Sequence, residues 1–156
     1  MNKAKIHNDS LINNYLPADY SDSFSKEVVV KENITPDAFF DMVFNQFPCW
    51  INWLLKLRNA LVKPLGLDTK SRFSDSVCER NANEIIWGMP DKHLTFHVSM
   101  WCGEFHDNKQ ELCITTVVKF NNTLGRLYFF VIQFFHGIII RSLLNNIQKK
   151  LYDNTH

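Results

Sequence analysis

The chain has 156 residues, of which 46% are hydrophobic and 21% are charged, and this composition excludes a disordered chain and suits one globular domain. The formal net charge of +1 gives no overall field that would attract nucleic acid. Four cysteines without a CxxC pair are typical of reduced thiols. Since the first residues also lack the apolar run of a signal peptide, we expect a cytoplasmic protein.

Residues 1–15 are polar and rich in asparagine, and we expect a flexible N-terminal arm followed by one domain over residues 16–151. Residues 24–31 contain three consecutive valines, which predicts a short strand. The surrounding segment, residues 19–41, holds six acidic residues against two lysines. We interpret it as a solvated acidic face.

Two short helices are predicted after this strand. Thr35 is a suitable N-cap, and Pro36 and Asp37 are residues favoured in a first helical turn. Apolar residues then recur on one side as far as residue 47. Pro48 ends that helix, and a second apolar stripe at helical spacing runs over residues 50–61 until Pro64 stops it.

The middle of the chain alternates between apolar and polar residues, as expected for strands with one buried face. Segments 76–80, 84–88, 93–102 and 112–120 are predicted strands, separated by turn-forming residues. Antiparallel pairing would join their apolar positions into one row. The row consists of Ile85, Trp87, Leu94, Phe96, Val98, Met100, Cys102, Leu112, Ile114, Thr116, Val118 and Phe120.

Residues 121–123 are suited to begin a last helix that reaches about residue 150, and its residues 124–144 are strongly apolar. Only 14 residues separate Arg126 from Arg141, and they cover roughly 21 Å, less than the ~30 Å hydrocarbon core of a bilayer. We therefore predict a core helix without a transmembrane span, covered around most of its circumference. The predicted contact seam with the sheet contains Leu124, Leu127, Tyr128, Val131, Phe134, Phe135, Ile138 and Ile139.

This order of elements resembles the helix-grip fold of the START, polyketide-cyclase and plant-allergen (SRPBCC) superfamily. The chain is more closely similar to a bacterial family of small uncharacterised proteins, a domain of unknown function sometimes fused to epimerase-like domains. The matching segments are residues 57–59, 61–62, 64–67, 91–94 with 96, 124–128, 135–136 and 140–142. The resemblance implies an α+β fold in which a curved antiparallel sheet wraps a long C-terminal helix. Phe134 stands where the family pattern has a proline, which puts a kink of this helix in doubt.

The candidate ligand-binding residues are aromatic side chains that the predicted fold would place between sheet and helix, together with one histidine. They are Trp87, Phe96, Phe120, Tyr128, Phe135 and His136. Residue type does not distinguish a filled core from a cavity lined by these side chains. His93 and His97 are four positions apart in a strand, about 13 Å, too far to share a metal ion. We expect them on a solvated sheet face, and no motif implies a metal or another cofactor.

Three functions remain open. The first is a non-catalytic module that binds a hydrophobic or amphipathic small molecule between sheet and helix. The second is a cyclase- or isomerase-type enzyme in which His136 or Tyr128 transfers protons in the same space. The third is a protein-interaction or dimerisation domain. The identity of a ligand and the oligomeric state are left open by the sequence.

Overall fold

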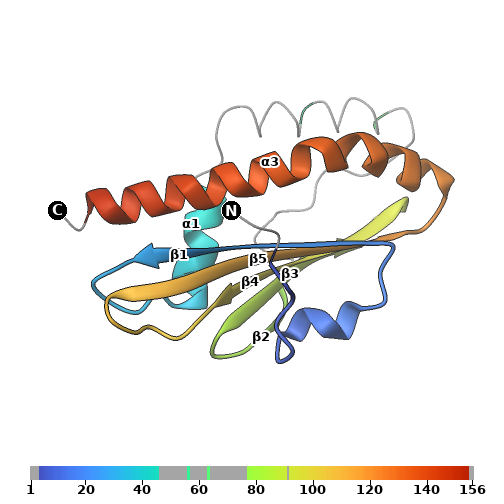
Figure 1. Ribbon diagram of the computed structural model, residues 1–156. Helices are drawn as coiled ribbons and strands as arrows, with labels where there is room; N and C mark the ends of the chain where they lie inside the picture. The colour runs from blue at the N-terminus through green and yellow to red at the C-terminus, as the bar shows by residue number, and fades with distance from the viewer. Residues whose placement is uncertain (1–3, 46–55, 57–62, 64–76, 91, 155–156) are drawn as a thin grey trace.

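The computed structural model describes residues 4–45, 56, 63, 77–90 and 92–154. In this part of the chain a 3-10 helix and a strand lead into a helix, a four-stranded meander and one long helix (Figure 1). The elements are η1 (Leu11–Tyr15), β1 (Tyr20–Val29), α1 (Pro36–Asn45), β2 (Val77–Arg80), β3 (Glu84–Pro90), β4 (Leu94–Cys102), β5 (Lys109–Phe120) and α3 (Thr123–Asp153).

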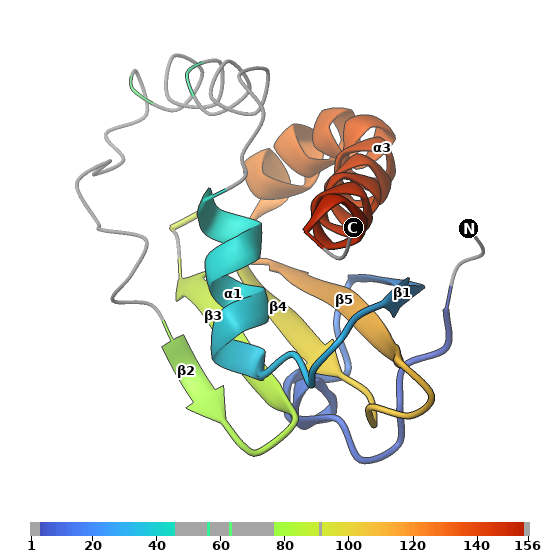
Figure 2. The ribbon, with the colours of Figure 1, turned by 90° about the vertical axis from the view of Figure 1, so that its left-hand side faces the viewer.

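The strands form one antiparallel sheet in the order β1-β5-β4-β3-β2. Helices α1 and α3 lie on one face of the sheet and η1 lies on the other (Figure 2). The predicted α+β class, with an antiparallel sheet and a long C-terminal helix, is therefore confirmed. α1 corresponds to the first predicted short helix, whereas the second, over residues 50–61, lies outside the described residues.

The strand register joins the apolar positions as the alternation predicted. Phe96 lies opposite Val118, and Met100 lies between Ile85 and Ile114 in neighbouring strands. Phe96, Met100 and Ile114 pack in a core with Phe39 of α1 and buried residues of α3, and Val118 packs with Phe129 of α3. Cys102 is opposite Leu112, one residue before Cys113, so the two cysteines lie on different faces, and both are free thiols.

Strand β1 begins four residues earlier than predicted. Tyr20 already pairs with Val118 of β5, and the ladder continues through Asp22 and Ser23, both almost fully buried. A neighbouring strand offers backbone partners whatever the side chain, so polar residues are drawn into the ladder. Asp22 therefore does not belong to a solvated acidic face.

The first turn of α3 is fixed to the start of β4. The Asn122 side chain accepts a hydrogen bond from the Gly125 amide at 2.9 Å, and the Asn121 amide donates to the His93 carbonyl at 2.9 Å. A Cβ at Gly125 would lie 1.9 Å from that carbonyl oxygen, so only glycine fits there. This attachment sets the rotation of α3 on the sheet.

The predicted seam of the last helix is wrong at most of its positions, although Tyr128 packs against the core as predicted. The side of α3 that contacts the sheet is formed by Phe129, Ile140, Leu143, Leu144 and Ile147, all buried. Residues 124–144 are apolar around much of the helix, so the periodicity did not single out one side. The attachment at Gly125 turns α3 so that a different side of the helix from the predicted one faces the sheet.

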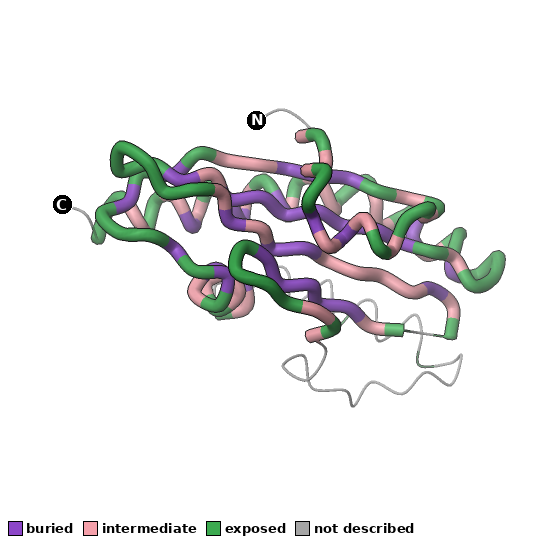
Figure 3. The backbone as a smooth tube through the Cα atoms, turned by 90° about the horizontal axis from the view of Figure 1, so that it is seen from below, coloured by how far each residue is buried: buried purple, intermediate pink, exposed green. Residues whose placement is uncertain are grey.

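The outer face of the sheet is partly covered by η1, which packs Ile12 against Ile86 and Val117. Glu84, fully buried, accepts hydrogen bonds from Ser10 Oγ at 2.6 Å and the Leu11 amide at 2.7 Å. Figure 3 shows the strands from this side, with buried segments along their length. A flexible arm over residues 1–15 stays a prediction, but its residues 10–15 contact the sheet.

The predicted solvated sheet face is also wrong at His97. Its ring stacks on Tyr15 of η1 with centroids 3.9 Å apart. The resulting burial lowers the pKa of His97 below its usual value, although the Glu79 carboxylate acts in the opposite direction. The other histidine predicted on this face, His93, contacts the Asn122 side chain and so takes part in the attachment of α3.

Candidate functional site

Helix α3 carries a row of exposed apolar side chains on the side away from the sheet, which we call the α3 apolar face. Phe134 is 63% exposed and the other members are between 37% and 63% exposed. The face consists of Leu124, Leu127, Phe130, Val131, Phe134, Phe135 and Ile138. Among the residues that the structure describes, the coverage around most of the helix that the sequence predicted is thus not found. An apolar surface of this extent is a feature of binding sites.

The α3 apolar face continues into a polar, positively charged surface. Positions three and four residues apart line one side of a helix, and the stripe that begins with Leu127 follows this spacing to the last turns. Its members are Leu127, Val131, Phe134, Ile138, Arg141, Asn145 and Lys149. One side of α3 is therefore apolar over its first half and cationic over its second half.

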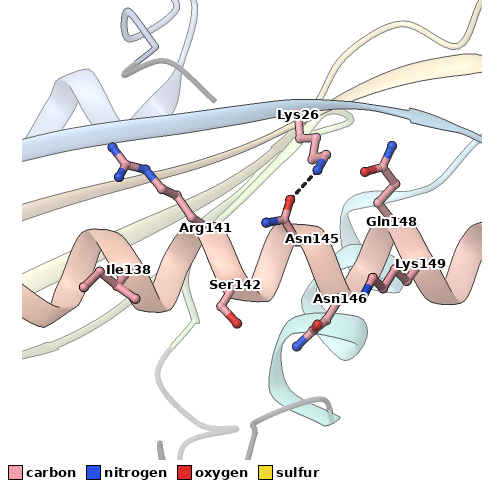
Figure 4. Close-up of a pocket in the computed structure, with 8 residues that line it drawn as sticks. All are labelled: Lys26, Ile138, Arg141, Ser142, Asn145, Asn146, Gln148 and Lys149. Carbon is pink, nitrogen blue, oxygen red and sulfur yellow. Dashed lines mark hydrogen bonds between the residues drawn. The ribbon is translucent and has the colours of Figure 1, made fainter.

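A pocket of about 590 Å³ lies where β1 borders the second half of α3 (Figure 4). Lys26 reaches into it from β1, and its ammonium group donates a hydrogen bond to Asn145 Oδ1. The lining is Lys26, Ile138, Arg141, Ser142, Asn145, Asn146, Gln148 and Lys149. Ile138 belongs both to this pocket and to the α3 apolar face, so the two surfaces meet at this residue.

The charge of the pocket is not compensated within the described residues. The lining residues that the structure describes include three cations, Lys26, Arg141 and Lys149, and no carboxylate. In the described part of the chain none of the three forms an ion pair; the guanidinium of Arg141 lies over the Phe24 ring, 5.0 Å from its centroid. Such a pocket attracts an anion.

A second group of polar residues is buried between β1 and α3. His136 Nε2 lies 3.1 Å from Thr116 Oγ1 and 3.5 Å from Asp22 Oδ1. The Tyr20 hydroxyl donates to the other oxygen, Asp22 Oδ2, at 2.6 Å, and burial together with this carboxylate raises the pKa of Tyr20. The Asp22 and His136 side chains are 2% and 16% exposed.

Asp22 Oδ1 is distinctive because it has no hydrogen-bond partner among the described residues. At 3.5 Å, the contact with His136 is an ion-pair distance but is longer than a good hydrogen bond. A buried carboxylate oxygen without a donor is unfavourable. The arrangement provides a histidine next to a buried acceptor, which is a pair able to hold a proton.

The six predicted ligand-binding residues lie in four environments. Trp87 and Phe96 pack together, with ring centroids 5.2 Å apart. Phe120 and Tyr128 belong to a cluster around Phe129, which Phe96 also contacts. Phe135 lies on the α3 apolar face, half exposed, whereas His136 faces the sheet. Ligand binding by these six residues stays a prediction.

Sequence reasoning missed Asp22, Lys26 and the pocket. The signal for Asp22 and Lys26 was their alternation with Phe24 and Val28, which places all four on the β1 face toward α3. Among the described residues, no group of three or more His, Cys, Asp or Glu is arranged to hold a metal ion. His106 pairs with Asp107 at 3.1 Å on an exposed turn.

By length and composition alone, α3 would suffice to cross a membrane, with a mean hydropathy of 1.7 over 18 residues. Its sheet-facing side is nevertheless packed into the core, as described above. Comparison with protein families gives a match over residues 15–143 to the family described as "Protein of unknown function (DUF2867)". Comparisons with curated proteins and with solved structures give no match.

Proposed function

The chain belongs to the DUF2867 family of proteins of unknown function, and we propose that it is a non-catalytic binding module for an amphipathic small molecule. The ligand lies along the α3 apolar face with its polar end in the pocket between β1 and α3. The observation that carries this proposal is the position of Ile138, at which apolar face and pocket meet. We further propose that the sheet and α3 represent the helix-grip type of fold and that the protein is cytoplasmic.

The sizes of the two surfaces support a small ligand. A volume of about 590 Å³ is within the ~300–1,000 Å³ usual for small-molecule pockets. The stripe from Leu127 to Ile138 is roughly 16 Å long at the helical rise per residue. In this proposal α3 remains on the sheet and does not cross a bilayer, since Leu143, Leu144 and Ile147 are buried in the core.

The test is binding of a fluorescent fatty acid below its micelle concentration. Phe134→Gln removes a ring that is 63% exposed and that a bound chain would cover. Full burial of a phenylalanine contributes about 1.5–3 kcal/mol, so this fraction gives about 1–2 kcal/mol, or roughly 5–30-fold weaker binding. Phe105→Gln is the matched control because Phe105 is 36% exposed on the loop between β4 and β5.

Equal affinity of both variants and the unaltered protein would contradict the proposal, as would absence of fatty-acid binding to all three. Circular dichroism and thermal unfolding of the variants establish that each is folded. Neither substituted side chain is buried, so we expect unfolding temperatures close to that of the unaltered protein.

Dimerisation through the α3 apolar face is less favourable. α3 carries Arg126, Arg141, Lys149 and Lys150 against Asp153, a balance of +3. Two copies that pair these faces bring cations near cations in either helix direction, which costs free energy. We expect a monomer by sedimentation velocity over a wide concentration range. A dimer abolished by Phe134→Gln would favour the interaction domain instead.

The buried group around His136 favours a second candidate, an isomerase- or cyclase-type enzyme. Its supporting observation is the Asp22 carboxylate, 3.5 Å from His136 Nε2. We rank it lower because neither residue lines the pocket described above, and Nε2 points toward the sheet. Once a ligand is identified, its NMR spectrum is followed during incubation with the protein. New signals that are absent with His136→Gln would establish turnover, and an unchanged spectrum would exclude it.

A further inference from the structure

We infer that the ligand of this module is a single-chain amphiphile with an anionic head, a carboxylate or a phosphate monoester. The inference rests on the proposed function and adds the chemical class of the head. It follows from the pocket lining, whose described residues supply three positive charges and neutral hydrogen-bond donors but no negative charge.

The positive charge of the pocket is available to a ligand. Glu27, the carboxylate next to Lys26 in β1, is paired with Lys109 at 2.9 Å. Asp22, the other nearby carboxylate of β1, is buried beside Tyr20 and His136. The nearest acidic groups of β1 are therefore engaged elsewhere, and a bound anion would supply the missing countercharge.

Two cationic groups of the pocket lie between α3 and β1. Asn145 holds the Lys26 ammonium group above α3, and Arg141 extends from the helix toward β1 (Figure 4). Its guanidinium lies over the Phe24 ring, which fixes its orientation. Guanidinium and ammonium groups form charge-assisted hydrogen bonds with carboxylates and phosphates. The amide group of Gln148 also points toward β1, whereas Ser142 and Asn146 project from the other side of α3 (Figure 4).

The apolar part of the ligand has one continuous path from this pocket. Ile138 is 61% exposed at the pocket rim, and the stripe leads back through Phe134 and Val131 to Leu127. The path follows one side of one helix and so is suited to a single chain. A head in the pocket and a chain on this path would use both surfaces at once.

The experiment compares heads on an identical chain, by competition against the fluorescent fatty acid below micelle concentrations. Dodecanoate and dodecyl phosphate carry anions, dodecan-1-ol is neutral, and dodecyltrimethylammonium is cationic. Hydrogen bonds to charged groups are the stronger kind, so we expect the anions to bind roughly ten-fold more tightly than the alcohol, and the cation most weakly. Added salt should reduce this preference.

Matched variants locate the effect. Lys26→Gln combined with Arg141→Gln should weaken dodecanoate binding roughly ten-fold and leave dodecan-1-ol binding unchanged. Arg126→Gln is the control for Arg141, because Arg126 also lies over a phenylalanine ring, at 5.5 Å, but outside the pocket. Lys150→Gln is a second control, one residue from the pocket cation Lys149. Both controls should keep the anion preference.

The outcomes separate the two claims. The inference of an anionic head is wrong if dodecan-1-ol and dodecanoate bind equally well, or if the control variants lose as much affinity for dodecanoate as the pocket variants do. The proposed function would still stand in either case. If no amphiphile binds, both are wrong. If the protein binds vesicles of anionic phospholipid but no free amphiphile, the surface serves a membrane and the inference is overturned.

Discussion

Replacement of two glycines of α3 by alanine should have opposite effects on stability. Within a helix, alanine is favoured over glycine by about 1 kcal/mol. At Gly137 a Cβ would meet only the Phe24 ring, at 3.4 Å, which is an ordinary contact. At Gly125 it would lie 1.9 Å from the His93 carbonyl oxygen and 2.6 Å from its carbon. The backbone of α3 or of residues 93–94 must then move.

We expect Gly137→Ala to stabilise the protein by about 0.5–1 kcal/mol. Overpacking costs about 1–3 kcal/mol and occasionally more. Displacement of the first turn of α3 would also disturb the cap at Asn122, so Gly125→Ala should destabilise the protein by about 2–3 kcal/mol. For a domain of this size the unfolding temperature should rise by about 2 °C in the first variant and fall by about 5–10 °C in the second.

Differential scanning calorimetry of the two variants, with urea unfolding as a second measure, tests these values. The reasoning is refuted if Gly125→Ala is as stable as Gly137→Ala, because the close approach between α3 and His93 would then be absent. A destabilised Gly137→Ala would refute the assigned packing between α3 and Phe24.

Three further predictions concern the sheet. Burial lowers the pKa of His97 below the usual 6.5, so the unfolded chain binds the His97 proton at a higher pH than the folded protein does. As the pH is lowered from about 6.5, the free energy of unfolding should therefore decrease, and it should decrease less in His97→Gln. Glu84→Ala leaves buried donors such as Ser10 unpaired and should cost about 3 kcal/mol in urea unfolding; a loss under 1 kcal/mol would contradict this attachment of η1. Burial raises the pKa of Cys102 to about 12, so mass spectrometry should show iodoacetamide labelling at pH 8 on exposed Cys78 and not on Cys102 unless urea is added.

Much of the sheet could be predicted because alternation is a local property of the sequence. Phe96 and Met100 alternate with polar residues, and this pattern determines which side chains share a face. The cap of α3 was also predictable, since Asn122 has the side chain that accepts from the first turn. These features depend on residues close together in the chain.

The candidate site was harder to predict because it depends on which side of α3 meets the sheet. Phe129, buried, and Phe130, exposed, are adjacent residues of the same type. Their different surroundings follow from the attachment of Gly125 to His93, which no local pattern reveals. Asp22 was assigned to an acidic surface for a related reason, since its burial depends on pairing with β5 far along the chain.

The pairing of β1 with β5 has a consequence for how the protein is made. Tyr20 pairs with Val118, so this edge of the sheet is completed only after a segment far along the chain has left the ribosome. Until then Phe24 and Val28 have no neighbouring strand, and α3 has not been synthesised. Contacts between such distant positions form slowly because a long loop must close first. The nascent chain therefore carries unpaired apolar segments while the residues between β1 and β5 are synthesised, an interval in which chaperones have the most to protect.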